Sequence, residues 1–123
     1  MRRMLIVDDE QDICDCLTQF FSTRGFAVST AWNGEGALEQ LAHAAIDVVL
    51  LDILLPGLSG IEVLKRAKVL QPRARIVMVS GIDQTEMRLL AQQCGASGYI
   101  IKPFDFALST WSTVFANPTH TAL

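Results

Sequence analysis

The chain has 123 residues, half of them hydrophobic, which is enough for one domain with a sizeable core and too few for two. Ten Lys and Arg residues against thirteen Asp and Glu leave a net charge of −3, so the composition does not favour nucleic-acid binding. No apolar stretch approaches the ~20 residues that cross a bilayer, and three cysteines do not make a disulfide framework, so we expect a cytosolic protein without a membrane segment.

Five short apolar runs rich in β-branched residues predict strands, and helical patterns lie between them. The runs are Met4–Val7, Ala27–Ala31, Val48–Leu51, Ile76–Val79 and Tyr99–Ile101. The third run contains no polar residue, which is typical of a strand covered by helices on both faces. The alternation predicts an α/β fold with a single doubly wound parallel sheet. We expect one domain over residues 1–117 and a short polar tail over 118–123.

The segments between the runs predict amphipathic helices, and capping residues indicate where several of them begin. Asn33 is a candidate N-cap of the second helix, and Asp83 with Glu86 three residues later resembles a capping box for the fourth. Asp105 is a candidate cap of the fifth helix. Three side chains of the fifth helix are expected to face inward, namely Leu108, Trp111 and Phe115.

Polar residues follow four of the five apolar runs. Asp8 and Asp9 follow the first run, Asp52 the third, Ser80 the fourth and Lys102 the fifth. Ligands of open parallel sheets bind beyond the carboxyl ends of the strands, so these side chains are expected at one edge. Three carboxylates repel one another unless a cation neutralises them, and oxygen ligands without His or Cys favour Mg²⁺ or Mn²⁺. Lys102 and Ser80 suit the oxygens of a transferring phosphoryl group.

The order and spacing of these residues resemble the receiver domains of two-component response regulators. The resemblance extends from residue 4 to about residue 117. Four segments carry it, namely Ile6–Glu10, Leu51–Gly60, Val79–Gly81 and Gly98–Phe104. It implies a flavodoxin-like fold of five βα units with strand order 2-1-3-4-5, an order for which a receiver protein is a known example.

The resemblance also implies the chemistry of the site. Asp52 would accept a phosphoryl group from a sensor histidine kinase or a histidine phosphotransfer protein. Asp8, Asp9 and Asp52 would hold Mg²⁺, for which Mn²⁺ can substitute, and the Leu54 carbonyl would complete the protein ligands. Such a protein catalyses only its own phosphorylation and dephosphorylation, so we expect it not to be an enzyme with an external substrate.

A conformational switch is the third implication. Ser80 and Lys102 would contact the phosphoryl group, and Tyr99 would turn inward as Ser80 moves toward it. The face formed by the fourth helix, the fifth strand and the fifth helix would then act on an output domain, a downstream protein or a second copy of the chain. The peptide bond between Lys102 and Pro103 would be cis.

Each of these residues also has a structural interpretation. Asp8 and Asp9 could cap the first helix, and Ser80 could cap a turn. Lys102 could be a solvated surface lysine, and Tyr99 a core aromatic with its hydroxyl at the rim. These interpretations would all have to hold together, at four different strand ends.

Three other classes of protein share parts of the pattern. A magnesium-dependent phosphohydrolase commonly has two Asp residues two positions apart after its first strand, whereas Asp8 and Asp9 are adjacent. A flavodoxin-like cofactor binder would need a hydroxyl- and glycine-rich phosphate loop at this point, where the acidic residues would repel phosphate. A receiver used only as a scaffold is disfavoured by the complete acidic set. The sequence does not identify the kinase or the output, nor whether the receiver stands alone or belongs to a longer protein.

Overall fold

The computed structural model describes residues 1–116, in which five parallel strands form one sheet. The strands lie in the order β2-β1-β3-β4-β5, which confirms the predicted fold class and order. Their bounds are β1 Arg2–Val7, β2 Phe26–Ala31, β3 Val48–Leu51, β4 Arg75–Ser80 and β5 Gly98–Ile101. The expected tail over 118–123 lies outside the described residues.

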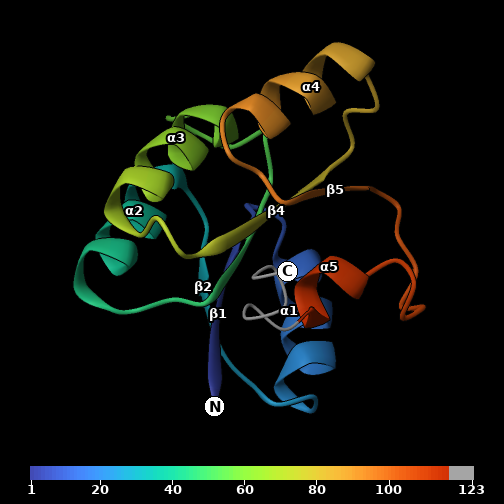
Figure 1. Cartoon of the computed structure of the whole chain (residues 1–123). Helices are drawn as coiled ribbons and strands as arrows, with labels where there is room; N and C mark the ends of the chain where they lie inside the picture. Colours follow the sequence, from blue (N-terminus) through green and yellow to red (C-terminus); the bar gives the residue numbers. More distant parts are fainter. Residues whose placement is uncertain (117–123) are drawn as a thin grey trace, which may run out of the picture.

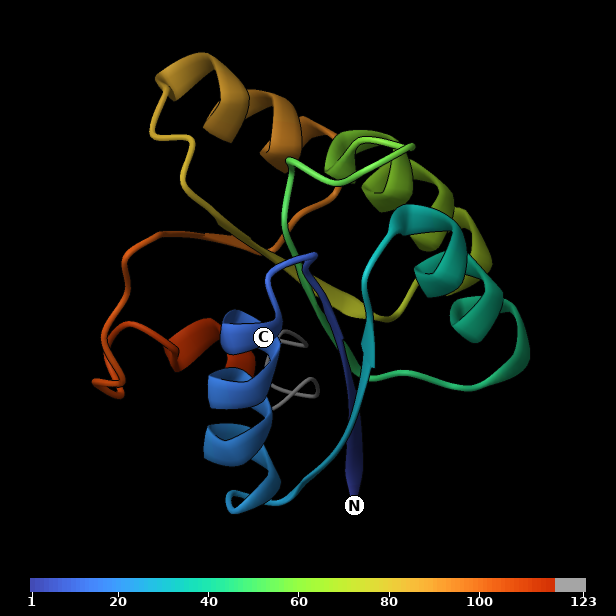
Figure 2. The ribbon, with the colours of Figure 1, turned by 180° about the vertical axis from the view of Figure 1, so that it is seen from behind.

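Helices cover both faces of the sheet. Their bounds are α1 Gln11–Ser22, α2 Gly34–His43, α3 Gly60–Leu70, α4 Thr85–Gln93 and α5 Ser112–Phe115. Figures 1 and 2 show α1 and α5 on one face and α2, α3 and α4 on the other. Among the described residues, none of the helices combines the length and the apolar composition that crossing a bilayer requires.

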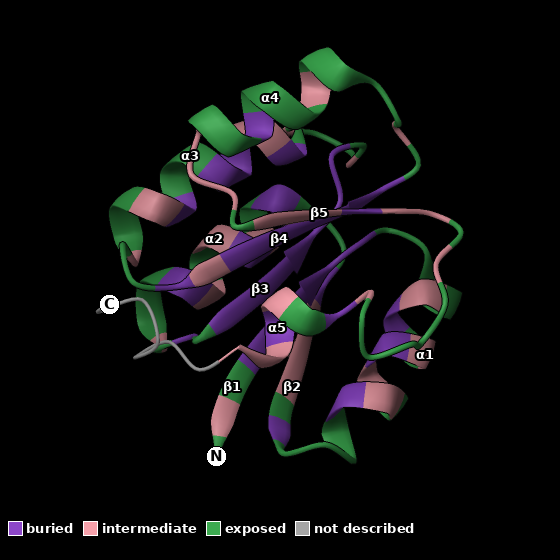
Figure 3. Cartoon of the chain, turned by 45° about the vertical axis from the view of Figure 1, so that its right-hand side comes forward, coloured by how far each residue is buried: buried purple, intermediate pink, exposed green. Residues whose placement is uncertain are grey.

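The two faces of the sheet build two hydrophobic clusters because successive side chains of a strand point to opposite faces. Leu5 and Val49 pack in the cluster beneath α2, α3 and α4, whereas Met4 and Val48 pack in the cluster beneath α1 and α5. Every residue of β3 is buried, as the central strands in Figure 3 show. The apolar run in β3 is therefore the consequence of being covered twice, and each such side chain contributes about 1.5–3 kcal/mol by burial.

Of the three predicted helix caps, one is confirmed and two are wrong. Asn33 caps α2 as predicted, because its side-chain oxygen accepts a hydrogen bond of 2.7 Å from the Gly36 amide. The capping box at Asp83 was wrong, since α4 begins at Thr85 and Gln84 occupies the cap position. Asp83 therefore lies one residue before the cap and instead pairs with the Arg88 guanidinium at 3.2 Å.

The fifth helix is only four residues long and begins later than expected. Asp105 does not cap it, because its carboxylate accepts a 2.6 Å hydrogen bond from the Thr110 hydroxyl and closes a turn before the helix. Leu108 lies in this turn and is 71% exposed, so its expected inward position was wrong. Trp111 is fully buried as predicted, and Phe115 packs against the same cluster.

Candidate functional site

The site forms where the neighbouring strands β1 and β3 end, at the upper edge of the sheet in Figure 1. β1 and β3 are paired neighbours, and one more backbone hydrogen bond follows the end of each strand, from Asp52 to β1 and from Asp8 to β2. The Asp52 amide donates to the Val7 carbonyl at 3.0 Å, and the Asp8 amide donates to the Ala31 carbonyl at 3.1 Å. Asp8 and Asp52 are only 2% and 6% exposed. Two buried carboxylates therefore sit side by side on a rigid backbone.

Lys102 joins these carboxylates from the other side of the site. It follows β5, and its amide donates to the Ser80 carbonyl at 2.9 Å. Its ammonium donates to Asp8 Oδ2 at 2.7 Å, to Asp52 Oδ2 at 2.9 Å and to Glu10 Oε1 at 3.1 Å. The strand ends thus bring Asp8, Asp52 and Lys102 together, as the sequence predicted. The Lys102–Pro103 peptide bond is cis.

One ammonium serves three carboxylates, and both burial and these hydrogen bonds shift the pKa values of Asp8 and Lys102. Burial raises the pKa of Asp8, and this effect outweighs the hydrogen bonds that Asp8 receives from Lys102 and from the Glu10 amide. Burial alone would lower the pKa of Lys102, but its hydrogen bonds to Asp8, Asp52 and Glu10 raise it above its usual value. Lys102 is therefore charged at neutral pH. Its single positive charge does not balance the three carboxylates beside it, so a further cation would be attracted to the site.

Carboxylate oxygens of Asp8, Glu10 and Asp52 lie within 4.8 Å of one another, so this group could hold a metal ion. The donors are all oxygens, which suits a hard divalent cation. Asp9, which the sequence favoured as a ligand, is exposed and outside this group, and its role stays a prediction. Sequence reasoning missed Glu10. Its signal was the long acidic side chain one residue beyond the adjacent aspartates.

The segment that follows Asp52 depends on a close approach of two backbones. Gly60 opens α3, and its amide donates to the Ile53 carbonyl at 2.8 Å. A Cβ atom at Gly60 would lie 2.0 Å from the Asp52 carbonyl oxygen, so no other residue fits here. The Leu54 amide donates to Asp52 Oδ1 at 3.3 Å and helps to orient the carboxylate. The predicted role of the Leu54 carbonyl as a metal ligand stays a prediction.

Ser80 and Tyr99 both contact the start of the segment between β4 and α4. Ser80 ends β4 and is fully buried, and its hydroxyl accepts a hydrogen bond of 3.3 Å from the Ile82 amide. The half-buried Tyr99 donates its hydroxyl to the Ile82 carbonyl at 2.7 Å. The Arg88 guanidinium lies 5.1 Å from the centre of the Tyr99 ring. The two predicted switch residues thus share one structural contact, and the switching itself stays a prediction.

Comparison with known protein families gives one match over most of the chain. The model of the response regulator receiver domain matches residues 4–109. Sporulation initiation phosphotransferase F of Bacillus subtilis is 36% identical over 103 residues, which cover 84% of this chain and 83% of that protein. Other curated relatives are longer, and the chain spans 23% of one regulatory protein and 46% of another.

Solved structures show the same similarity. A response regulator protein from Burkholderia pseudomallei, with a phosphorylated aspartic acid, a calcium ion and citrate, has a TM-score of 0.87 and 26% identity over 97% of this chain and 69% of that chain. The CheX–CheY–BeF3–Mg+2 complex from Borrelia burgdorferi has a TM-score of 0.86 and 33% identity over 94% of this chain and 90% of that chain.

Proposed function

Because the chain belongs to the response regulator receiver domain family, we propose that it accepts a phosphoryl group on Asp52. The donor would be the phosphohistidine of a sensor histidine kinase or of a histidine phosphotransfer protein. The observation that carries the proposal is the buried Asp52 carboxylate, held 2.9 Å from the Lys102 ammonium beside a second buried carboxylate, Asp8. A nucleophile with a fixed countercharge is what phosphoryl transfer needs, since its catalysis is mostly positioning and electrostatics.

In the proposed step, a carboxylate oxygen of Asp52 attacks the phosphorus atom in line with the leaving group. The new O–P bond forms as the P–N bond of the phosphohistidine breaks, and the imidazole leaves with the electron pair. Lys102 would then neutralise a phosphoryl oxygen, and the Ser80 hydroxyl would donate to another. Attack by water on the acyl phosphate would later return Asp52 and inorganic phosphate, so the protein would act only on itself and not on an external substrate.

The donor set at the acidic edge fits a divalent cation, and Mg²⁺ is the ion that we propose, with Mn²⁺ as a substitute. Asp8, Asp9, Asp52 and the Leu54 carbonyl are the ligands expected from the sequence. When bound, the cation would offset the charge of the carboxylates and of the incoming phosphoryl group. The calcium ion and Mg+2 named with the two solved receiver structures support a cation at a site of this kind.

The proposed output is a change of the face formed by α4, β5 and α5. Ser80 and Tyr99 both hydrogen-bond to the backbone of Ile82. Movement of Ser80 toward a phosphoryl group would therefore displace Ile82 and change its hydrogen bond with the Tyr99 hydroxyl. Leu89 and Leu90 of α4 are 51% and 40% exposed and offer apolar surface to a partner. That partner would be an output domain, a downstream protein or a second copy of this chain, in the cytosol that the sequence favours.

The test is phosphorylation by a small donor. The wild-type protein incubated with Mg²⁺ and acetyl phosphate should gain one phosphoryl group in its intact mass. Asp52→Asn should abolish the gain, and removal of Mg²⁺ by a chelator should reduce it strongly. Glu39→Gln, which changes an exposed carboxylate on α2, is the control and should behave as the wild type. Incorporation that persists in Asp52→Asn would overturn the assignment of the acceptor.

A further inference from the structure

All three N–H donors of the Lys102 ammonium are engaged in hydrogen bonds in this structure. An ammonium carries three N–H donors, and three carboxylates accept from Lys102 at distances of 2.7 to 3.1 Å. The proposed function requires Lys102 to donate to an oxygen of the incoming phosphoryl group while Asp52 is still a carboxylate. One of the three existing bonds must therefore break before that contact can form.

The three acceptors differ in how readily they can be released. The side chains of Asp8 and Asp52 are 3% and 7% exposed, so loss of either bond would leave a buried carboxylate with a backbone amide but no cation as its partner. The Glu10 side chain is 62% exposed, and water can replace Lys102 there at little cost. The bond to Glu10 is thus the one that gives way.

The backbone of Glu10 is held while its side chain is free to leave. Its amide donates to Asp8 Oδ1 at 2.9 Å, and its extended backbone forms the cap position of α1. Glu10 Oε1 has no other protein partner than Lys102 within the described residues. The side chain can therefore swing into solvent without any change in the strand or the helix.

We propose that Glu10 is a positioning residue that occupies the third donor of Lys102 in the unphosphorylated protein and yields it to a phosphoryl oxygen. This inference rests on the proposed function. The Glu10 bond holds Lys102 pointing at Asp52 while the site is empty of phosphoryl, and it competes with the contact that phosphorylation requires. Glu10 thus slows phosphorylation.

Two variants separate the contact from the charge. Glu10→Ala removes both, whereas Glu10→Asp keeps the charge on a side chain one methylene shorter that falls short of Lys102. Both should raise the rate constant of phosphorylation by acetyl phosphate roughly two- to fivefold, the range set by the strength of an exposed ion pair. Asp12→Ala removes an exposed carboxylate of the first turn of α1 and is the control for charge repulsion of the donor. Acceleration in Glu10→Ala alone, or equally in Asp12→Ala, would overturn the inference.

A second readout needs neither phosphorylation nor metal. The Lys102 ammonium signal of ¹⁵N-lysine-labelled protein should shift and exchange its hydrogens faster in both Glu10 variants than in the wild type. The Mg²⁺ dissociation constant of Glu10→Asp, which keeps the charge at the acidic edge, should stay unchanged, whereas a weaker affinity would make Glu10 a metal ligand and contradict the inference. If the wild type is phosphorylated and the Glu10 variants have the same rate constant and the same Lys102 signal, this inference alone is refuted. A wild type that gains no phosphoryl group would overturn the proposed function and this inference with it.

Discussion

Cys14 is a free cysteine that lies directly beneath the acidic edge. It is 1% exposed, and its Sγ donates to the Asp8 carbonyl at 3.3 Å. Burial, followed by the nearby charge of Asp8, raises the pKa of the Cys14 thiol to about 11. A thiol in this environment stays protonated at neutral pH and is a packing residue rather than a nucleophile.

This pKa predicts that the protein loses stability as the pH rises. The unfolded thiol releases its proton near its ordinary pKa of 9.0 and the folded thiol near 11, so between these values the unfolded state binds fewer protons. The free energy of unfolding should fall in this window, by about 1–2 kcal/mol. Urea unfolding at several pH values measures the slope. Cys14→Ala should flatten this slope, and an equal slope in the variant and the wild type would contradict the prediction.

The residues of the site could be predicted from the sequence where they lie at the end of a strand. Asp8, Asp52, Ser80 and Lys102 follow or end strands, so topology alone brings them to one edge. Glu10 was not predictable in this way, because its contact with Lys102 depends on the reach of a long side chain across a loop.

Among the elements, the connection from β3 to α3 is the most constrained. Gly60 stands where a Cβ atom would be 2.0 Å from the Asp52 carbonyl oxygen and 2.6 Å from the Ile53 Cα atom. Both neighbours are backbone atoms and cannot rotate away. The helix can therefore begin close behind the acceptor only because this residue has no side chain.

Gly60→Ala should lower the free energy of unfolding by about 1–3 kcal/mol, since relief of the overlap must move either α3 or the backbone of Asp52. The phosphorylation rate should fall as well, because the acceptor moves with its backbone. Gly81→Ala is the matched control, as a Cβ atom there meets nothing within 4 Å. Urea unfolding of the two variants gives the comparison. A Gly60→Ala protein as stable as Gly81→Ala would show that the connection accommodates a side chain at residue 60 without strain.

The start of the fifth helix was the element that the sequence misplaced. Leu108 and Trp111 are three residues apart, a spacing that favours a helix. Aromatic packing prevails over this local pattern, since Phe106 stacks on Phe20 of α1 at 4.4 Å between ring centres. The Trp111 indole donates to the Asp105 carbonyl at 2.7 Å and fixes the turn. These contacts join residues that are distant in sequence or depend on the folded turn, so the helical period alone could not predict them.

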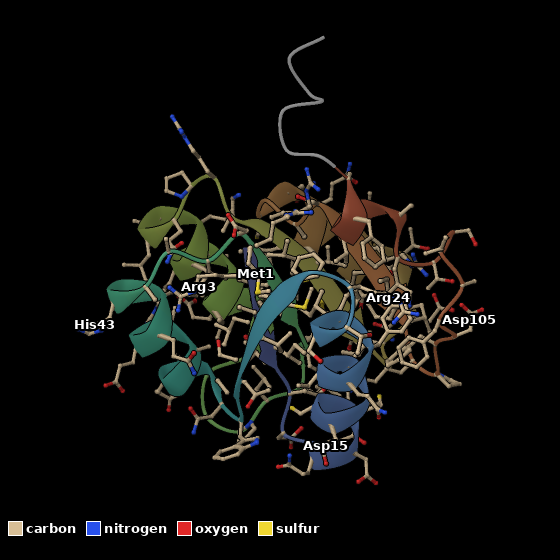
Figure 4. All side chains as sticks on the ribbon, turned by 90° about the horizontal axis from the view of Figure 1, so that it is seen from below. Met1, Arg3, Asp15, Arg24, His43 and Asp105 are labelled. Carbon is tan, nitrogen blue, oxygen red and sulfur yellow. The ribbon has the colours of Figure 1, made fainter. Side chains whose placement is uncertain are left out.

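On the scale of the whole molecule, charge is divided between the two edges of the sheet. Basic residues gather at the amino edge, opposite to the site. They begin β1 and β4 or lie in the connections that lead into β2 and β4, namely Arg2, Arg3, Arg24, Arg73 and Arg75. Figure 4 views the molecule from this side and labels Arg3 and Arg24. The carboxyl edge carries Asp8, Asp9, Glu10 and Asp52, so the acceptor lies in a negative field that attracts cations and repels phosphodonors.

A divalent cation bound at the carboxyl edge should therefore stabilise the whole fold by more than the screening of carboxylate repulsion alone. Mg²⁺ at one hundred times its dissociation constant should raise the free energy of unfolding by about 2.7 kcal/mol, because it binds the folded carboxylates and not the unfolded chain. NaCl at the same ionic strength should have a smaller effect, since it only screens the repulsion. Asp9→Asn should lose much of the Mg²⁺ effect if Asp9 is the ligand that the sequence predicts, while Glu39→Gln on α2 should keep it. Chemical unfolding at matched ionic strength measures each case. Equal stabilisation by the two salts would mean that the acidic edge holds no specific cation.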